Sequence, residues 1–485
     1  MTHKIGTYAI ATLIAAMMAG TMNAQVGNVF IHDPSTVVKC DGKYYTFGTG
    51  AGGLISKDGW TWTDGAVRTG GGVAPDVVKI GDRYLVSYSA GFPGTEGQTR
   101  GNIITMWTKT LDPTSPDFGY SEPQLVAWAA SDEDCWAIDP AFLLDPTTGR
   151  LWCSYGTYFG EIRIVELDPA TGKRVEGNEA VAIAIDCEAT ALVYRDGWYY
   201  LLGTHGTCCD GVNSTYNIVC GRSKSVTGPY IDNVGRDMMQ GGGKMVLSAG
   251  DRRTGPGHFG YYVEEEGVEK MSCHYEADYD LSGRSTLGIR SLIWKNGWPV
   301  AADFFKEGTY EIESERRGYS LELAVDFVRA RGGMMMFRRG AQDQPNVVLE
   351  DQKLEDVIGT WPEGETEIRL GDYMFRPHQK WTVTAVPDAG GYLGAPYYKI
   401  VIEGTERALA ASADAELVSV PEFTGAPEQL WRIEQLIDGT FRILAKSVPG
   451  HENEQLGLVC TGDSTLSLGK FDFNSDNCKW NFRVR

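Results

Sequence analysis

Apolar and polar residues alternate in five similar segments of the chain, and each segment is broken in its middle by a short polar turn. The segments begin at Pro34, Pro75, Pro140, Ala189 and His258. Alternation with a period of two on either side of a tight turn is typical of a β-hairpin. Five such units, none of which can bury both of its faces alone, close most naturally into a five-bladed β-propeller. The pattern therefore predicts an all-β fold.

Polar residues stand at the start of each predicted hairpin. In a propeller the first strand of each blade lies nearest the axis, so the residues at its start converge on one pocket. Carboxylates and imidazoles gathered in one cleft are unfavourable unless they pair, bind a metal or carry out chemistry. A single acid in such a position can simply cap a turn, but a recurrence in most of the repeats favours a catalytic site. The residues are His32, Asp33, Asp76, Asp139, Glu188 and His258.

A second pattern begins near Gly308, after the last hairpin. Its three repeated segments resemble a ricin-type β-trefoil, in which a tryptophan of each repeat packs into the core. We expect residues 25–305 to form the propeller and residues 306–485 to form a β-trefoil-like domain, which serves either as structural support or in carbohydrate binding. The segments start at Gly308, Tyr397 and Gly439, and their signatures are Gln379 with Trp381, Gln429 with Trp431, and Cys478 with Trp480.

The N-terminus carries the features of an export signal. Lys4 precedes an apolar run from Tyr8 to Met18, and small residues follow up to Ala24. This order is typical of a signal peptide, here residues 1–24 with cleavage near Ala24. No later stretch approaches ~18 uninterrupted apolar residues, so no membrane insertion is expected. The mature protein is predicted to be secreted or periplasmic.

Charge and cysteine content narrow the classes of partner. The 485 residues carry a net charge of −20 with a pI near 4.8. Phosphate binding needs a basic surface, so neither nucleic acid nor an anionic membrane is an expected partner, and a neutral polymer fits better. The ten cysteines include no C-x-x-C pair, which gives no support to a zinc ribbon or a thioredoxin-like motif.

The acidic channel residues suit glycoside hydrolysis. One carboxyl group protonates the leaving oxygen while a second activates water or attacks the anomeric carbon, and a third raises the pKa of the proton donor. Around these residues the chain resembles glycoside hydrolase family 43, specifically its endo-α-1,5-L-arabinanases. The resemblance covers residues 25–303. Its motifs include VFIHDPS at 29–35, AIDPAF at 137–142, CCDGVNSTYNIVCGRSKSVTGPY at 208–230 and GPGH at 255–258.

The resemblance implies a role for each of three carboxyl groups. Asp33 is expected to be the general base that activates water, Glu188 the general acid, and Asp139 the residue that modulates the pKa of the acid and orients it. Members of this family invert the anomeric configuration, which calls for about 6.5–9.5 Å between base and acid.

The remaining channel residues are expected to bind a metal or the substrate. The resemblance places His258 beside a metal, usually Ca²⁺ whose other ligands are water. His32 and Asp76 are expected to contact substrate from their positions at the channel. His205 and His274 also end strands near this region, and we expect hydrogen-bonding or core roles for them.

The expected substrate is plant cell-wall arabinan or its oligosaccharides, cleaved at internal α-1,5 linkages by a monomeric enzyme. An exo-acting α-L-arabinofuranosidase or a β-xylosidase would use the same carboxyl groups, so both stay open. A non-catalytic glycan-binding protein is a third interpretation, which the three channel acids disfavour. The segment SKDGWTW at 56–62 is similar to a sialidase Asp-box, but it occurs once and no arginine occupies a channel position.

Overall fold

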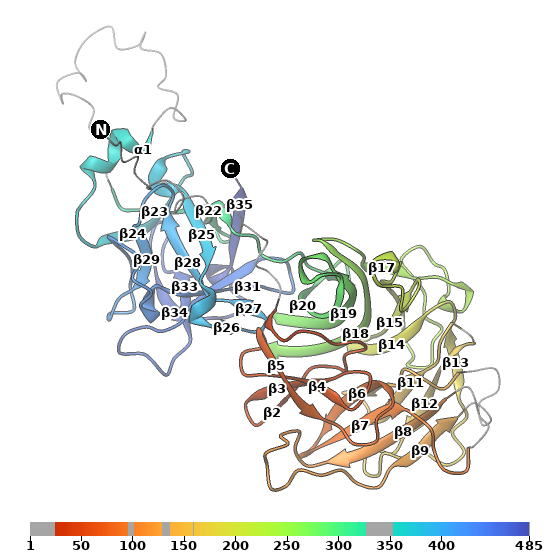
Figure 1. Cartoon of the computed structure of the whole chain (residues 1–485). Helices are drawn as coiled ribbons and strands as arrows, with labels where there is room; N and C mark the ends of the chain where they lie inside the picture. Colours follow the sequence, from red (N-terminus) through yellow and green to blue (C-terminus); the bar gives the residue numbers. More distant parts are fainter. Residues whose placement is uncertain (1–24, 96–100, 129–135, 159, 326–352, 485) are drawn as a thin grey trace, which may run out of the picture.

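The computed structural model describes residues 25–95, 101–128, 136–158, 160–325 and 353–484. The signal peptide predicted at residues 1–24 lies outside them. Two β-rich bodies lie side by side, the first built from β1 to β21 and the second from β22 to β35 (Figure 1). No helix of the described residues is long and apolar enough to cross a membrane.

The first body consists of five antiparallel sheets in sequence order, with β1 added in parallel beside β5. The first sheet holds β1 (Val26–Gly27), β2 (Val38–Cys40), β3 (Lys43–Phe47), β4 (Gly52–Ser56) and β5 (Thr61–Val67). The second holds β6 (Val73–Ile80), β7 (Arg83–Ser89), β8 (Asn102–Thr108) and β9 (Gln124–Trp128). The third holds β10 (Ala141–Leu144), β11 (Leu151–Tyr155), β12 (Ile162–Leu167) and β13 (Val181–Ala184).

The fourth and fifth sheets repeat this arrangement, with short 3₁₀ helices in their loops. The fourth holds β14 (Glu188–Arg195), β15 (Trp198–His205), β16 (Asn217–Ser223) and β17 (Lys244–Leu247), with η1 (Gly211–Asn213) and η2 (Met238–Gln240). The fifth holds β18 (Arg253–Glu265), β19 (Val268–Asp278), β20 (Arg284–Lys295) and β21 (Trp298–Ala301), with η3 (Tyr279–Leu281).

The first strands of the five sheets surround a common axis. A cavity of about 270 Å³ on this axis is lined by side chains of β6, β10, β14 and β18 and by Thr36, which precedes β2. The segment before β2 closes the ring, because Val29 accepts a backbone hydrogen bond from Leu287 of the fifth sheet. Apolar side chains fill the spaces between neighbouring sheets, as where Leu85 and Val126 pack with Leu151 and Val165. The five-bladed β-propeller predicted from the sequence is the fold that forms.

The second body begins at β22 (Gly308–Ser314), so the predicted boundary between residues 305 and 306 falls in the link from β21 to β22. Its other strands are β23 (Ser320–Leu323), β24 (Thr366–Gly371), β25 (Trp381–Ala385), β26 (Gly391–Tyr392), β27 (Ala395–Pro396), β28 (Tyr398–Ile402), β29 (Ala408–Ala411), β30 (Leu417–Val420), β31 (Trp431–Gln435), β32 (Phe441–Ala445), β33 (Leu456–Cys460), β34 (Leu466–Lys470) and β35 (Trp480–Val484). The short helices are α1 (Leu354–Val357), η7 (Ile358–Thr360), η8 (Pro377–Gln379), η9 (Pro387–Ala389), η10 (Pro427–Gln429) and η11 (Asp476–Cys478).

Six strands of the second body pair in a closed ring, in the order β22, β25, β28, β31, β32 and β35, with β35 again beside β22. Closure leaves this barrel without an open edge. Trp381, Trp431 and Trp480 are fully buried. Each indole N–H donates to a backbone carbonyl of the same body, which satisfies the only polar atom of the buried side chain.

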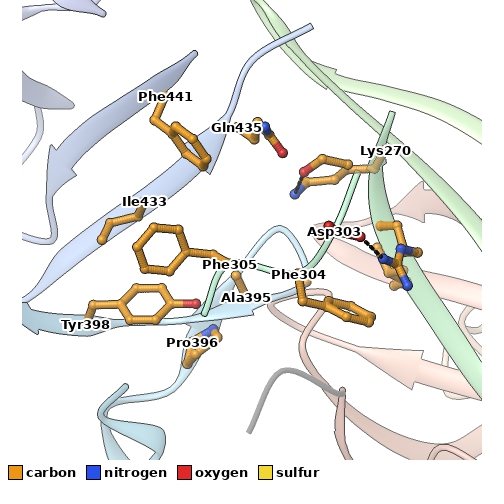
Figure 2. Close-up of a pocket in the computed structure, with 14 residues that line it drawn as sticks. Lys270, Asp303, Phe304, Phe305, Ala395, Pro396, Tyr398, Ile433, Gln435 and Phe441 are labelled. Atoms are coloured by element: carbon orange, nitrogen blue, oxygen red, sulfur yellow. Dashed lines mark hydrogen bonds and ion pairs between the residues drawn. The ribbon is translucent and has the colours of Figure 1, made fainter. Parts of the chain in front are cut away.

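The two bodies are joined by contacts that bury charged groups. The Glu265 carboxylate, at the end of β18, accepts hydrogen bonds from Arg432, Arg442 and Tyr392 of the second body. Figure 2 shows a neighbouring pocket in which Phe305 lies close to Tyr398 and Phe441. The second body therefore packs directly against the propeller.

Candidate active site

Each blade of the propeller has one residue in the left-handed backbone region, before or within its inner strand. This conformation is uncommon for residues other than glycine, and such strain is tolerated where surrounding structure enforces it. The repetition identifies the equivalent position in the five blades. These residues are Asp33, Ala74, Asp139, Ala189 and His258, with φ between 45° and 58°.

Asp33 is surrounded by hydrogen-bond donors. Its Oδ2 lies 2.9 Å from Nδ1 of His32 and accepts a hydrogen bond from the Thr49 hydroxyl, and its Oδ1 lies 3.5 Å from Nδ1 of His258. Burial alone would raise the pKa of Asp33, but the hydrogen bonds from His258 and His32 and the nearby positive charge hold it well below its usual range. Asp33 is therefore ionised in this pocket.

The pKa values of Glu188 and Asp139 are shifted in the opposite direction from that of Asp33. Burial raises the pKa of Glu188, and the Asp33 charge adds to this rise although the Tyr216 hydroxyl donates to Oε1 of Glu188. Burial also raises the pKa of Asp139 to about 8, with contributions from the charges of Asp33 and Glu188 and partial compensation by His258. Asp139 accepts a hydrogen bond of 3.2 Å from the backbone N–H of Ala189.

This division of charge matches the chemistry expected of the site. Carboxyl groups that share a pocket cannot all ionise, and environments that push their pKa values apart define which is base and which is acid. Asp33 is ionised and can accept a proton from water. Glu188 and Asp139 hold a proton more tightly, so Glu188 can donate one to a leaving oxygen.

His32 bridges two acids at the edge of this pocket. Its Nδ1 faces Asp33, and its Nε2 lies 3.1 Å from Oε1 of Glu276. Burial opposes the charged imidazolium, but hydrogen bonds with Asp33, Cys208 and Glu276 outweigh this effect, so the pKa of His32 is raised. The side chain is half-buried, so a substrate contact by His32 stays a prediction.

Asp76 occupies a different position along its inner strand from the other channel acids. The residue equivalent to Asp33 in its blade is Ala74, and Asp76 comes two residues later along the strand. Its carboxylate is buried and accepts hydrogen bonds from the backbone N–H of Thr36 and Phe142, which ties three blades together. This arrangement favours a bracing role, and the substrate contact expected for Asp76 stays a prediction.

His258 is the residue expected beside a metal. Its Nδ1 is buried 3.5 Å from Oδ1 of Asp33 and makes no well-aligned hydrogen bond within the described residues. Burial opposes its protonation, but Asp33, Asp139 and Asp76 together outweigh it and raise the pKa of His258, so this location favours positive charge. No group of three or more His, Cys, Asp or Glu ligand atoms in the described chain includes His258. Its surroundings therefore suit a cation only if water supplies most of the ligands, because Ca²⁺ takes six to eight oxygens.

The structure adds residues to which the sequence assigned no catalytic role. His274 and Glu276 lie two residues apart on β19, so both point to the same face. The backbone N–H of Asp33 donates to Nδ1 of His274 at 2.9 Å, and Nε2 of His274 lies 3.3 Å from Glu276. Burial lowers the pKa of His274 and favours its neutral form. Tyr216 belongs to the motif at residues 208–230, and this motif was the feature of the sequence that could have placed it near Glu188.

The comparison with protein families identifies the propeller. A model of the glycosyl hydrolases family 43 matches residues 23–299, more than half of the chain. The chain belongs to glycosyl hydrolases family 43. It is a glycoside hydrolase, and the enzyme class expected from the channel acids is thereby confirmed.

Two curated proteins and a solved structure are similar to this chain over the same region. An extracellular exo-α-(1→5)-L-arabinofuranosidase of Cellvibrio japonicus is 32% identical over 332 residues, which cover 61% of this chain and 92% of that protein. An extracellular endo-α-(1→5)-L-arabinanase of Bacillus subtilis is 31% identical and covers 56% of this chain and 88% of its own. A crystal structure of an exo-1,5-α-L-arabinanase from a bovine ruminal metagenomic library superposes with a TM-score of 0.51 at 30% identity, covering 56% of this chain and 97% of its own.

Proposed function

We propose that this enzyme hydrolyses arabinan by cutting internal α-1,5-L-arabinofuranosidic linkages with inversion at the anomeric carbon. The observation that carries the proposal is that two carboxyl groups of one propeller channel have contrasting surroundings, which lower the pKa of Asp33 and raise the pKa of Glu188. Both named relatives act on α-1,5-linked arabinose, which supports arabinan as the substrate class.

In this mechanism Asp33 removes a proton from a water molecule, whose oxygen forms a bond to the anomeric carbon. Glu188 gives its proton to the glycosidic oxygen as the bond to that oxygen breaks on the opposite face. The carboxyl groups of Asp139 and Glu188 repel each other when both are ionised, so Asp139 makes loss of the Glu188 proton less favourable until that proton is needed. Asp33 finishes protonated and Glu188 ionised, and proton exchange with solvent restores the starting state.

We further propose that His258 holds a divalent cation, Ca²⁺ with water ligands. A buried imidazole nitrogen that lies among three acids and makes no well-aligned hydrogen bond within the described residues supports this assignment. A bound cation would supply positive charge that keeps Asp33 ionised. Metal analysis of the purified protein, together with the melting temperature before and after prolonged chelation, tests it. Absence of any divalent ion from the protein would contradict it.

The second body is proposed to be a β-trefoil. Support comes from the closed six-stranded ring and from three buried tryptophans spaced at nearly equal intervals along the chain. In two repeats the preceding glutamine braces a turn in the same way: Gln379 accepts from the N–H of Met374, and Gln429 from that of Thr424. Binding of residues 306–485 to insoluble arabinan would distinguish a sugar-binding role from structural support.

Export to the periplasm or the cell exterior is proposed from the predicted signal peptide, and both relatives are described as extracellular. N-terminal sequencing of the exported protein tests cleavage after Ala24. We expect a monomer, which the mass measured by light scattering will check.

An exo-acting α-L-arabinofuranosidase is the second candidate, because the Cellvibrio relative is an exo-enzyme. The size of the products released from linear and branched arabinan separates the two. Internal cleavage produces a ladder of oligosaccharides and a rapid fall in viscosity. Release of arabinose alone from the chain ends contradicts the endo mode, and absence of any product from either polymer contradicts arabinan hydrolysis.

A further inference from the structure

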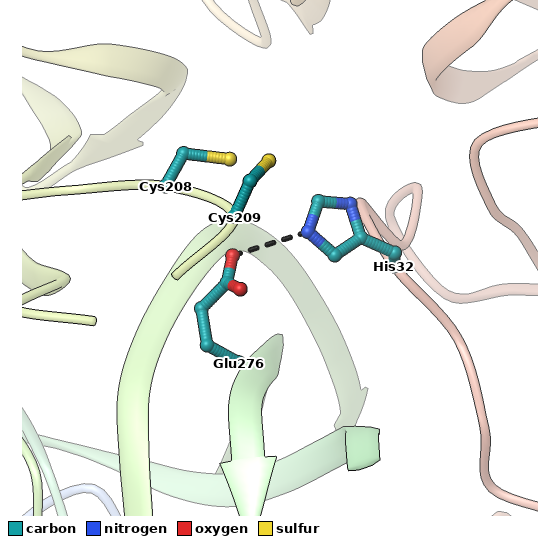
Figure 3. A group of neighbouring side chains, drawn as sticks. All are labelled: His32, Cys208, Cys209 and Glu276. Atoms are coloured by element: carbon teal, nitrogen blue, oxygen red, sulfur yellow. Dashed lines mark hydrogen bonds and ion pairs between the residues drawn. The ribbon is translucent and has the colours of Figure 1, made fainter. Parts of the chain in front are cut away.

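Four potential metal ligands meet at the edge of the catalytic pocket. His32 comes from the segment before β2, Cys208 and Cys209 from the turn between β15 and η1, and Glu276 from β19. One ligand atom from each lies within 4.8 Å of every other (Figure 3). These residues are far apart in sequence, so the propeller itself brings them together.

The two cysteines differ from the others in the described chain. Seven of the nine described cysteines are buried in the two bodies and act as small apolar residues. Cys208 is half-buried and Cys209 is exposed, and neither forms a disulfide. Exposed thiols side by side with an imidazole and a carboxylate have no packing explanation.

The donor set selects the kind of ion. Two thiolates, one imidazole and one carboxylate are ligands that Zn²⁺ accepts in tetrahedral geometry, whereas Ca²⁺ and Mg²⁺ prefer oxygen alone. Bond lengths of about 2.0–2.3 Å place tetrahedral ligands about 3.3–3.8 Å apart. The ligand atoms lie within 4.8 Å of one another, so a contraction of at most about 1 Å brings them to these separations, and side-chain rotation at the exposed Cys209 can supply it.

The surroundings resemble the outer shell of a zinc site. Ligating histidines commonly direct their second nitrogen at a carboxylate. Nδ1 of His32 lies 2.9 Å from Asp33, so its Nε2 remains for a metal on the side of Glu276. Glu276 is itself held 3.3 Å from His274.

We propose that His32, Cys208, Cys209 and Glu276 form a binding site for Zn²⁺, and that the bound ion inhibits the enzyme. The ion replaces the proton on Nε2 of His32 and breaks the contact of that nitrogen with Glu276. The same imidazole holds the general base Asp33, so the ion alters the orientation of the base and narrows the entrance for sugar. Metal binding does not depend on the proposed arabinan hydrolysis, whereas the inhibition rests on it.

Binding is tested without substrate on the full-length protein, treated with a chelator and kept reduced under argon. Titration with Zn²⁺ against a chromophoric chelator should reveal one site per chain. Titration with Co²⁺ should produce thiolate charge-transfer absorption and the visible bands of a tetrahedral ion. The Cys208→Ser/Cys209→Ser double variant should lose both signals and more than about 100-fold in affinity.

The His451→Gln variant is the matched control, because His451 forms a 3.1 Å pair with Glu454 on the second body. It should bind Zn²⁺ as the unmodified protein does. Equal affinity of the double-cysteine variant and the unmodified protein overturns the site, and so does a Co²⁺ spectrum without thiolate absorption. A native thiol count that does not fall by two in the double variant also overturns it.

Inhibition is measured afterwards with a chromogenic arabinofuranoside. Zn²⁺ should reduce kcat of the unmodified protein at least about tenfold with reversal by chelator, while the double variant retains its own rate in Zn²⁺. Stoichiometric Zn²⁺ binding without any effect on rate overturns the inhibitory role. If the unmodified protein hydrolyses no arabinofuranoside, the proposed function fails, and the Co²⁺ and Zn²⁺ titrations still decide whether the site exists.

Discussion

Asp33 and Glu188 are both carboxylic acids in the same channel, and their neighbours divide the two roles between them. Asp33 is surrounded by donors from His32, Thr49 and His258, which stabilise its charge. Glu188 is buried with a single hydroxyl donor from Tyr216, so loss of its proton is unfavourable. The identity of each residue as base or acid therefore depends on what it contacts.

Replacing either residue by alanine should remove activity on linear arabinan while the fold persists. Loss of a general acid or base costs about 10²–10⁴ in rate. Substrates with an activated leaving group need little protonation, so Glu188→Ala should recover partly on an aryl arabinofuranoside and Asp33→Ala should not. Steady-state rates on both substrates, with circular dichroism as the folding control, check this. Wild-type activity of either variant on arabinan would refute the assignment.

The pH profile should respond to the charge of Asp139. The pKa of Glu188 is raised, so its proton is fully present at low pH and is lost as pH rises through that pKa, which defines the alkaline limb of kcat. Asp139→Asn removes a carboxyl group that repels Glu188 when both are ionised, and should move that limb to lower pH by about one unit. Asp112→Asn serves as the control, because Asp112 pairs with Lys43 away from the channel. An unmoved alkaline limb in Asp139→Asn would show that Asp139 does not modulate the acid.

At the scale of elements, the candidate site is formed around the left-handed residues before or within the inner strands. The left-handed residue turns the chain into the channel, and the groups around it bond to a neighbouring blade. The Asp139 carboxylate accepts from the N–H of Ala189 in the fourth blade, and the N–H of His258 donates to Thr204 at 2.9 Å. The turns therefore lock neighbouring blades together at the positions that carry the chemistry.

Strain at this turn can be measured with two alanines of β14. Ala189 has a φ of 45° and Ala191 lies two residues later, and both are buried. A left-handed conformation costs an alanine about 1–2 kcal/mol that glycine avoids. In Ala189→Gly, relief of this strain should offset the greater entropy of the unfolded chain and the loss of a buried methyl group. The free energy of unfolding should therefore stay nearly unchanged. Ala191→Gly has no such relief and should lose about 1–2 kcal/mol in denaturant titrations. Equal losses would show that the turn is unstrained.

At the scale of the whole molecule, the two bodies form a continuous packed unit, although the candidate catalytic residues all lie in the first. Glu265 accepts from Arg432 and Arg442, and Phe305 packs on Tyr398 and Phe441 across the junction. A backbone hydrogen bond from the N–H of Ile437 to the carbonyl of Gly267 also joins the two bodies. We therefore expect the second body to contribute more to the stability of the propeller than to its catalytic chemistry.

A chain ending at Phe305 should keep its turnover and lose stability. Every channel residue and every propeller strand precedes this position, so kcat/KM on a short arabino-oligosaccharide should match the full-length enzyme. The melting temperature should fall, because Glu265 and Phe305 lose their partners and apolar surface becomes exposed. Loss of turnover in a truncated chain that is still folded by circular dichroism would mean that the second body contributes to the active site.

Local patterns in the sequence were enough to predict the blades, the three catalytic candidates and the family. Hairpin alternation, turn chemistry and motif spacing are local properties of the chain, and residues such as Asp33 and Asp139 stand beside them in fixed positions. The position of Asp76 in its blade follows only from the folded structure, because it depends on which residue adopts the left-handed conformation. The place of Asp76 next to Pro75 in the sequence does not reveal this. The same holds for the convergence of His274 and Glu276 on Asp33, since ring closure brings the fifth blade beside the first. Contacts across hundreds of residues follow from that closure, and no local pattern in the chain encodes them.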